Sequence, residues 1–153
     1  MPRSVIVLED DPHIRRAVVR QIAEVEGFAV VAEAGDVAGG RAALAAGADL
    51  GVFDLELADG SSIPLIREAT DKGVAVLVLT VWDDDDKVYQ AIAAGAAGYL
   101  LKGDAGAKVA ESLAVLADGG SPISPSIARR LLDDLRTRAP AAPTPATSEL
   151  TPR

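Results

Sequence analysis

The stretch LGVFDLELADG, residues 50–60, holds the pattern on which the fold depends. Leu50 to Phe53 have the character of the end of a short apolar strand. Asp54 follows at once and Glu56 comes two residues later, where the chain should turn into solvent. A strand that delivers a carboxylate at its end raises the question of what that acid does.

Similar apolar runs recur along the whole chain, separated by segments of about twenty residues with helical spacing. The runs are Ser4–Leu8, Phe28–Ala32, Asp49–Phe53, Val74–Leu79 and Gly98–Leu101. The first and fourth are apolar without alternation, as expected of parallel strands that helices cover on both faces. This rhythm predicts an open, doubly wound α/β domain that ends near Gly119–Gly120.

The segment after this domain carries a helix start signal and then a change of composition. Ser124 is placed as an N-cap before Pro125, and the apolar residues Ile127, Leu131 and Leu135 follow at helical spacing. We expect residues 1–121 to be the α/β domain and 122–138 a linker helix. Residues 139–153, rich in proline and alanine, are expected to be an extended connector to a domain that is absent here.

Composition limits the classes of function. The chain has 15 Lys+Arg against 23 Asp+Glu, a net charge of −8, and only 3% aromatic residues, which argues against direct binding to nucleic acid. Cysteine is absent, so a disulfide framework and a thiolate metal site are excluded. No apolar run reaches membrane-spanning length and no signal peptide is recognisable, so we expect a cytoplasmic protein without membrane contact.

Polar residues whose side chains could bind a ligand or take part in a reaction follow four of the predicted strands. In doubly wound sheets ligands bind at the carboxyl ends of the strands, so these residues are predicted to converge on one pocket. They are Glu9–Asp10–Asp11, Asp54, Thr80 and Lys102. Acids placed close together repel one another unless a cation holds them ionised, and Mg²⁺ is the hard divalent cation that suits oxygen ligands.

The pocket predicted in this way suits a phosphoryl group. Lys102 would supply a positive charge, Thr80 a hydroxyl donor and the metal a second neutralising charge. Asp54 is the obvious nucleophile, since a carboxylate that attacks phosphorus gives an aspartyl phosphate.

These motifs resemble the receiver domains of two-component response regulators. The resemblance runs through VIVLEDDPHIR (5–15), VFDLELADGS (52–61), VLVLT (76–80) and AAGYLLK (96–102). It implies a flavodoxin-like sheet of five parallel strands in the order 2-1-3-4-5. It also implies a phosphoacceptor that assists its own phosphorylation and dephosphorylation, with a sensor histidine kinase as the phosphoryl donor.

The resemblance also implies a role for each motif residue. Asp54 would be the phosphoacceptor, and Thr80 and Lys102 would contact the phosphoryl group. Mg²⁺ would be held by Glu9, Asp10, Asp54 and the backbone carbonyl of Glu56. Phosphorylation would shift an existing equilibrium in which Thr80 moves toward the phosphoryl group and Tyr99 turns inward as a rotamer switch.

The form GAAGYLLK (95–102), the segment SPISPSIARRLL (121–132) and the closing ELTPR (149–153) resemble the NarL/FixJ subfamily. Its members continue into a LuxR-type helix-turn-helix domain, so this chain would control transcription and reach DNA only through that absent domain. A homodimer formed on phosphorylation is the expected partner state.

Two positions depart from the family pattern, and one adds a feature. Ala58 stands where proline is usual. Gly103 follows Lys102 where many receivers have proline, so a cis bond there would cost roughly 3 kcal/mol. Trp82, the only tryptophan, is predicted to lie at the rim of the acidic pocket as a gate against hydrolytic water, or else to cap the next helix from the surface.

Other interpretations remain open at this point. FDLELADG (53–60) faintly resembles the motif of haloacid-dehalogenase-like phosphatases, although Glu56 replaces their second Asp. A flavodoxin-like FMN carrier would need a phosphate-cradling loop where EDDPH (9–13) stands. A pseudo-receiver that works without phosphorylation is the main alternative. Asp11 is more simply a helix cap than a metal ligand, and Tyr99 could simply pack against the fourth helix.

Overall fold

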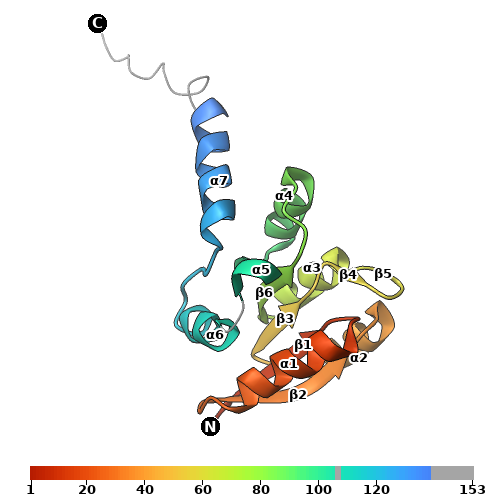
Figure 1. Cartoon of the computed structure of the whole chain (residues 1–153). Helices are drawn as coiled ribbons and strands as arrows, with labels where there is room; N and C mark the ends of the chain where they lie inside the picture. Colours follow the sequence, from red (N-terminus) through yellow and green to blue (C-terminus); the bar gives the residue numbers. More distant parts are fainter. Residues whose placement is uncertain (106–107, 139–153) are drawn as a thin grey trace, which may run out of the picture. The chain divides into compact units, whose positions relative to one another are not determined.

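The structure is a computed structural model that describes residues 1–105 and 108–138 (Figure 1). Five strands form one parallel sheet in the order β2-β1-β3-β6-β7, which confirms the predicted order of the five parallel strands. These strands are β1 (Arg3–Leu8), β2 (Phe28–Ala34), β3 (Leu50–Phe53), β6 (Ala75–Thr80) and β7 (Gly98–Leu101). A separate two-stranded hairpin of β4 (Glu56–Leu57) and β5 (Gly60–Ser61) follows β3 directly; the sequence pattern did not predict it.

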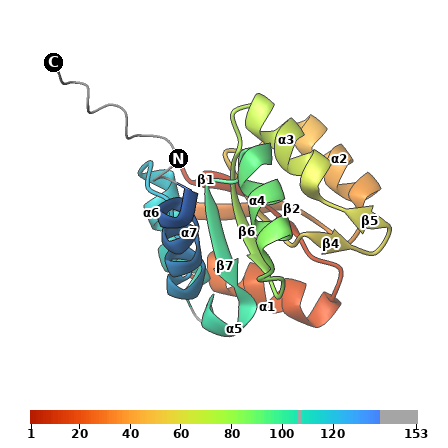
Figure 2. The ribbon, with the colours of Figure 1, turned by 90° about the horizontal axis from the view of Figure 1, so that it is seen from above.

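Helices cover both faces of the sheet, as the doubly wound prediction requires. On one side α2 contacts α3 and α3 contacts α4, whereas α1 and α6 pack together on the other (Figure 2). The helices are α1 (Pro12–Ala23), α2 (Val37–Ala46), α3 (Ile63–Asp71), α4 (Asp85–Ala94), α5 (Lys102–Ala105) and α6 (Val109–Ala117). The central strands β1, β3 and β6 are therefore almost fully buried, which explains their uninterrupted apolar sequence.

Strand register determines which side chains meet at the carboxyl edge of the sheet. Leu8 pairs with Phe53, so Glu9 and Asp54 leave neighbouring strands side by side. Thr80 pairs with Leu101, so Lys102 lies one residue beyond that pair. Thr80 is thus the last residue of β6 rather than the first residue after it, because its backbone still takes part in strand pairing.

Lys102 opens the short helix α5 immediately after β7. The part of the chain that the structure describes contains no cis peptide bond, so the bond between Lys102 and Gly103 is trans.

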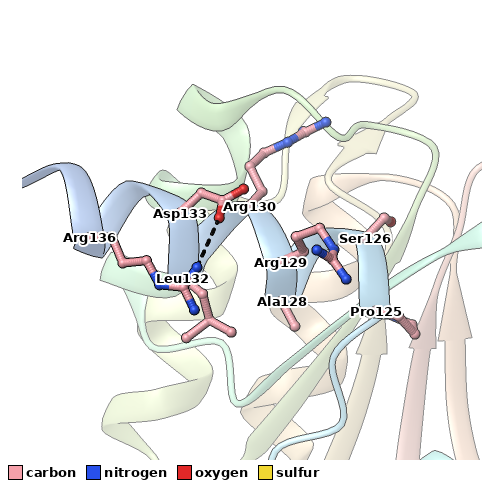
Figure 3. Close-up of a pocket in the computed structure, with 8 residues that line it drawn as sticks. All are labelled: Pro125, Ser126, Ala128, Arg129, Arg130, Leu132, Asp133 and Arg136. Carbon is pink, nitrogen blue, oxygen red and sulfur yellow. Dashed lines mark ion pairs between the residues drawn. The ribbon is translucent and has the colours of Figure 1, made fainter.

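The C-terminal helix α7 (Pro125–Arg138) belongs to a second compact unit that begins at Ser124, whereas the first unit spans Met1–Ile123. Figure 3 shows polar and apolar side chains along α7, with an ion pair of 3.7 Å between Arg136 and Asp133. The expected connector of residues 139–153 lies outside the described residues. Within the described ranges, we find no helix with the length and apolar character needed to span a membrane.

Candidate functional site

The centre of the site is a partly buried lysine, Lys102, between the two buried carboxylates of Glu9 and Asp54. The Lys102 ammonium Nζ lies 2.7 Å from Glu9 Oε1 and 2.8 Å from Asp54 Oδ2. Glu9 comes from the end of β1, Asp54 from the end of β3, and Lys102 from the end of β7. The topology thus brings together three residues that are far apart in the sequence, as predicted from their positions after strands.

Asp10 completes an acidic cluster beside this lysine. Carboxylate oxygens of Glu9, Asp10 and Asp54 all lie within 4.8 Å of one another, and Asp10 is the exposed member. One ammonium against three carboxylates leaves two negative charges, which a divalent cation would balance. An all-oxygen donor set that is open to solvent on one side fits Mg²⁺, which keeps several of its own waters.

The pKa values of Glu9 and Lys102, the two groups that contact each other beside Asp54, are both raised, for different reasons. Burial raises the pKa of Glu9 above its ordinary value, and the hydrogen bond from Lys102 only partly offsets that effect. For Lys102, burial opposes the charged form, but hydrogen bonds to Asp54 and Glu9 outweigh it and the pKa is raised. The lysine therefore stays charged, as a group that is to neutralise an anion must.

The loop after Asp54 is fixed by short hydrogen bonds. The Leu55 amide donates to Asp54 Oδ1 at 2.7 Å, and the buried Ser62 hydroxyl donates to the Asp54 carbonyl at 2.5 Å. The Ser62 amide also donates to the Leu55 carbonyl at 2.8 Å. Ser62 thus holds the backbone that carries Asp54, a role that its position in a polar loop did not disclose.

Thr80, Trp82 and Tyr99 form a second layer around the end of β6. The Trp82 amide donates to Thr80 Oγ1 at 3.4 Å, and the Tyr99 hydroxyl donates to the Trp82 carbonyl at 2.5 Å. Tyr99 is 1% exposed, so its ring already lies inward in this structure. The residues expected to act as a switch are therefore linked through the backbone of Trp82.

Trp82 is 40% exposed, and its indole contacts Lys87 of α4, whose Nζ lies 4.9 Å from the ring centroid. The same ammonium lies 3.2 Å from Glu56 Oε2. Sequence reasoning missed Lys87. The available signal was a single cation directly after the four acids Asp83–Asp86.

The remaining acids of the region have structural roles. Asp11 caps α1, where its carboxylate accepts from the amides of His13 and Ile14, and these hydrogen bonds lower its pKa. Asp84 caps α4 by accepting from the amide of Lys87, and Asp85 and Asp86 lie in the first turn, where the helix dipole favours them. The cap of α4 is thus an aspartate and not the indole of Trp82.

Known proteins with related sequences are regulators of transcription. The chain is 33% identical over 139 residues to the DNA-binding transcriptional activator DevR/DosR of Mycobacterium tuberculosis, covering 89% of this chain and 64% of that protein. It is 31% identical over 137 residues to the transcriptional regulatory protein LiaR of Bacillus subtilis, covering 86% and 64%. The chain therefore spans somewhat less than two thirds of the length of these relatives.

A solved structure agrees with this relationship. A two-component response regulator of the LuxR family from Aurantimonas sp. SI85-9A1 superposes with a TM-score of 0.78 at 27% identity, covering 88% of this chain and 98% of that one. The family model for the response regulator receiver domain matches residues 5–114, which include β1 from its third residue onward and the other four strands of the parallel sheet in full. The chain therefore belongs to the response regulator receiver domain family and is a NarL-like member of it.

Proposed function

We propose that this receiver domain accepts a phosphoryl group on Asp54 from a sensor histidine kinase and thereby controls a DNA-binding output domain. One observation carries the proposal: a buried Asp54 carboxylate with the Lys102 ammonium at 2.8 Å and two further carboxylates beside it. Receiver domains are signalling modules, so the expected product is a modified protein and not a released metabolite.

The transfer is a substitution at phosphorus. An oxygen of the Asp54 carboxylate bonds to phosphorus while the phosphorus–nitrogen bond of a phosphohistidine breaks, and the electron pair leaves with the imidazole. With an acyl phosphate as donor, a phosphorus–oxygen bond breaks instead and the carboxylate leaves. Dephosphorylation is a separate hydrolysis: water attacks phosphorus and gives up a proton, the bond to Asp54 breaks, and inorganic phosphate leaves.

The surrounding side chains would orient and neutralise the group that is transferred. Lys102 is held charged by its two carboxylate partners. As negative charge passes from Asp54 to the phosphoryl oxygens, its ammonium would exchange the Asp54 contact for a contact with those oxygens. The Thr80 hydroxyl would donate to the same oxygens from the end of β6. The backbone bonds of Leu55 and Ser62 would keep Asp54 in place while its charge changes.

Glu9, Asp10 and Asp54, together with the backbone carbonyl of Glu56, would hold Mg²⁺. When bound, this ion supplies positive charge that offsets the repulsion between the carboxylates and an incoming phosphoryl group. The donor set of three clustered carboxylates supports this assignment.

The response to phosphorylation would be a shift between two conformations of the β6–α4 loop. Thr80 would leave its bond with the Trp82 amide for the phosphoryl group, and the inward position of Tyr99 would become the dominant one. The face formed by α4 and β7, or that formed by α1 and α6, would then change its affinity for a second copy of the receiver.

The output would be transcriptional and the location cytoplasmic, as the likeness to transcriptional regulators supports. In this proposal residues 1–121 are the receiver, 122–138 the linker helix, and 139–153 a connector to a LuxR-type domain. DNA would be contacted only through that domain.

The decisive experiment is incubation of the purified chain with acetyl phosphate and Mg²⁺, followed by intact mass. We expect one added phosphoryl group in the wild type and none in Asp54→Asn, which should stay folded by circular dichroism. Labelling that persists in Asp54→Asn would place the modification elsewhere. A folded, Mg²⁺-binding wild type that takes up no phosphoryl group from acetyl phosphate or a kinase would instead favour a pseudo-receiver.

A further inference from the structure

We propose that Lys87 is a positioning residue that holds the indole of Trp82 closed over the rim of the phosphorylation site. The inference rests on the proposed function of Asp54 as a phosphoacceptor. The contact between Lys87 and Trp82 has no part in the phosphoryl transfer itself.

The ammonium of Lys87 joins three segments of the chain. Lys87 projects from the first turn of α4, Glu56 lies on β4 directly after the Asp54 loop, and Trp82 lies on the loop between β6 and α4. The ammonium lies 3.2 Å from the Glu56 carboxylate and 4.9 Å from the centre of the indole ring. We call these three residues the clasp.

The clasp constrains the indole from one side, and the backbone of Trp82 is constrained from the other. The Tyr99 hydroxyl donates to the Trp82 carbonyl, and the Trp82 amide donates to Thr80. Without Lys87 the backbone would remain anchored, but the ring would be free to rotate into solvent. The ammonium therefore acts on the side chain and leaves the strand that carries Thr80 intact.

A closed indole would restrict the water that hydrolyses the acyl phosphate on Asp54. Glu56 is two residues from Asp54 in the chain, so a lysine that pairs with Glu56 and contacts the indole ties Trp82 to the segment that carries the phosphoacceptor. Loss of the clasp should shorten the phosphorylated half-life about two- to fivefold, the size expected when one cation–π contact near the surface is removed.

The test compares the phosphorylated half-lives of four proteins: wild type, Lys87→Met, Trp82→Ala and the double variant. We expect Lys87→Met to shorten the half-life, and to have no further effect when Trp82 is already alanine, because the lysine acts through the ring. Lys87→Arg should restore the long half-life, since guanidinium also pairs with carboxylate and stacks on indole.

Equal half-lives of Lys87→Met and wild type would overturn the proposal. So would a full Lys87→Met effect in the Trp82→Ala background, because the lysine would then act by its charge alone.

A matched control is available on the far side of the same helical layer. Arg41 of α2 and Glu68 of α3 form an exposed ion pair of 2.7 Å that does not involve the site. Arg41→Met should leave the half-life unchanged. An effect as large as that of Lys87→Met would mean that any surface charge change acts on the site, which contradicts a specific clasp.

A second measurement needs no phosphorylation, so it separates failure of the clasp from failure of the proposed function. Trp82 is the only tryptophan, and acrylamide quenching of its emission reports the exposure of this one ring. Quenching should be stronger in unphosphorylated Lys87→Met than in wild type and Lys87→Arg. Equal quenching in all three would overturn the clasp even if Asp54 is phosphorylated normally.

Discussion

Two lysines near the carboxyl edge of the sheet form ion pairs that differ in their surroundings. Lys102 is 17% exposed and lies between the buried carboxylates of Glu9 and Asp54. Lys87 is 31% exposed and pairs with the half-exposed Glu56 beside an aromatic ring. The first lysine compensates two carboxylates that are largely withdrawn from water, whereas the second competes with water for its partner. The ammonium of Lys102 should therefore contribute strongly to the free energy of unfolding, whereas that of Lys87 should mainly set the position of one side chain.

Removing Lys102 should have the largest effect on stability. In Lys102→Met, the Glu9 and Asp54 carboxylates lose their shared cation while remaining buried, so we expect a loss of about 3 kcal/mol in EDTA. Urea unfolding of wild type and variant in EDTA measures it. A loss below about 1 kcal/mol would make Lys102 energetically equivalent to a surface lysine and would remove the contrast with Lys87.

A divalent cation should provide the next largest effect, because it supplies the charge that one lysine leaves uncompensated. Mg²⁺ at a hundred times its dissociation constant should add about 2.7 kcal/mol to the free energy of unfolding and raise the melting temperature accordingly. Asp10→Asn should remove most of this response, and it should slightly stabilise the protein in EDTA by relieving repulsion among the acids. An unchanged Mg²⁺ response in Asp10→Asn would contradict this ligand set.

The comparison also shows what the sequence can and cannot predict. Glu9, Asp54 and Lys102 could be predicted to meet because each follows an apolar strand, and parallel strands present their carboxyl ends at one edge. The sheet order confirms that reasoning.

The contact between Lys87 and Glu56 had no comparable signal. It depends on the rotation of α4 about its axis and on the hairpin of β4 and β5, which a short polar loop sequence does not specify. Ser62 escaped notice for a related reason: a serine in a turn is common, and only burial shows that its hydroxyl supports Asp54.

The pH dependence of stability should show that the ionisation of the buried Glu9 carboxylate opposes folding. Burial places its pKa in the folded protein above its ordinary value of 4.5. Its contribution to stability is therefore fully present below pH 4.5 and is lost as the pH rises through the folded-state pKa.

Unfolding in EDTA at a series of pH values tests this point against Glu9→Gln, which cannot ionise. The free energy of unfolding of wild type minus that of the variant should fall between pH 4.5 and neutrality. A difference that grows with pH would mean that Lys102 overcompensates for burial and that the folded-state pKa of Glu9 is lowered.

The smallest effect on stability is expected at Lys87, and it sharpens the comparison most directly. Lys87→Met keeps the aliphatic stem against the indole and removes only the ammonium, whose carboxylate partner remains solvated. We expect a loss of less than about 1 kcal/mol in urea unfolding, and a smaller one in 0.5 M salt than at low salt, because salt screens exposed pairs. The loss from Lys102→Met should depend less on salt, since its partners are buried.

If Lys87→Met lowered the free energy of unfolding as much as Lys102→Met, the clasp would be a principal anchor of α4 and would not act on the Trp82 ring alone. The half-life of the phosphorylated protein would then report partial unfolding of α4, which hydrogen exchange along that helix would detect.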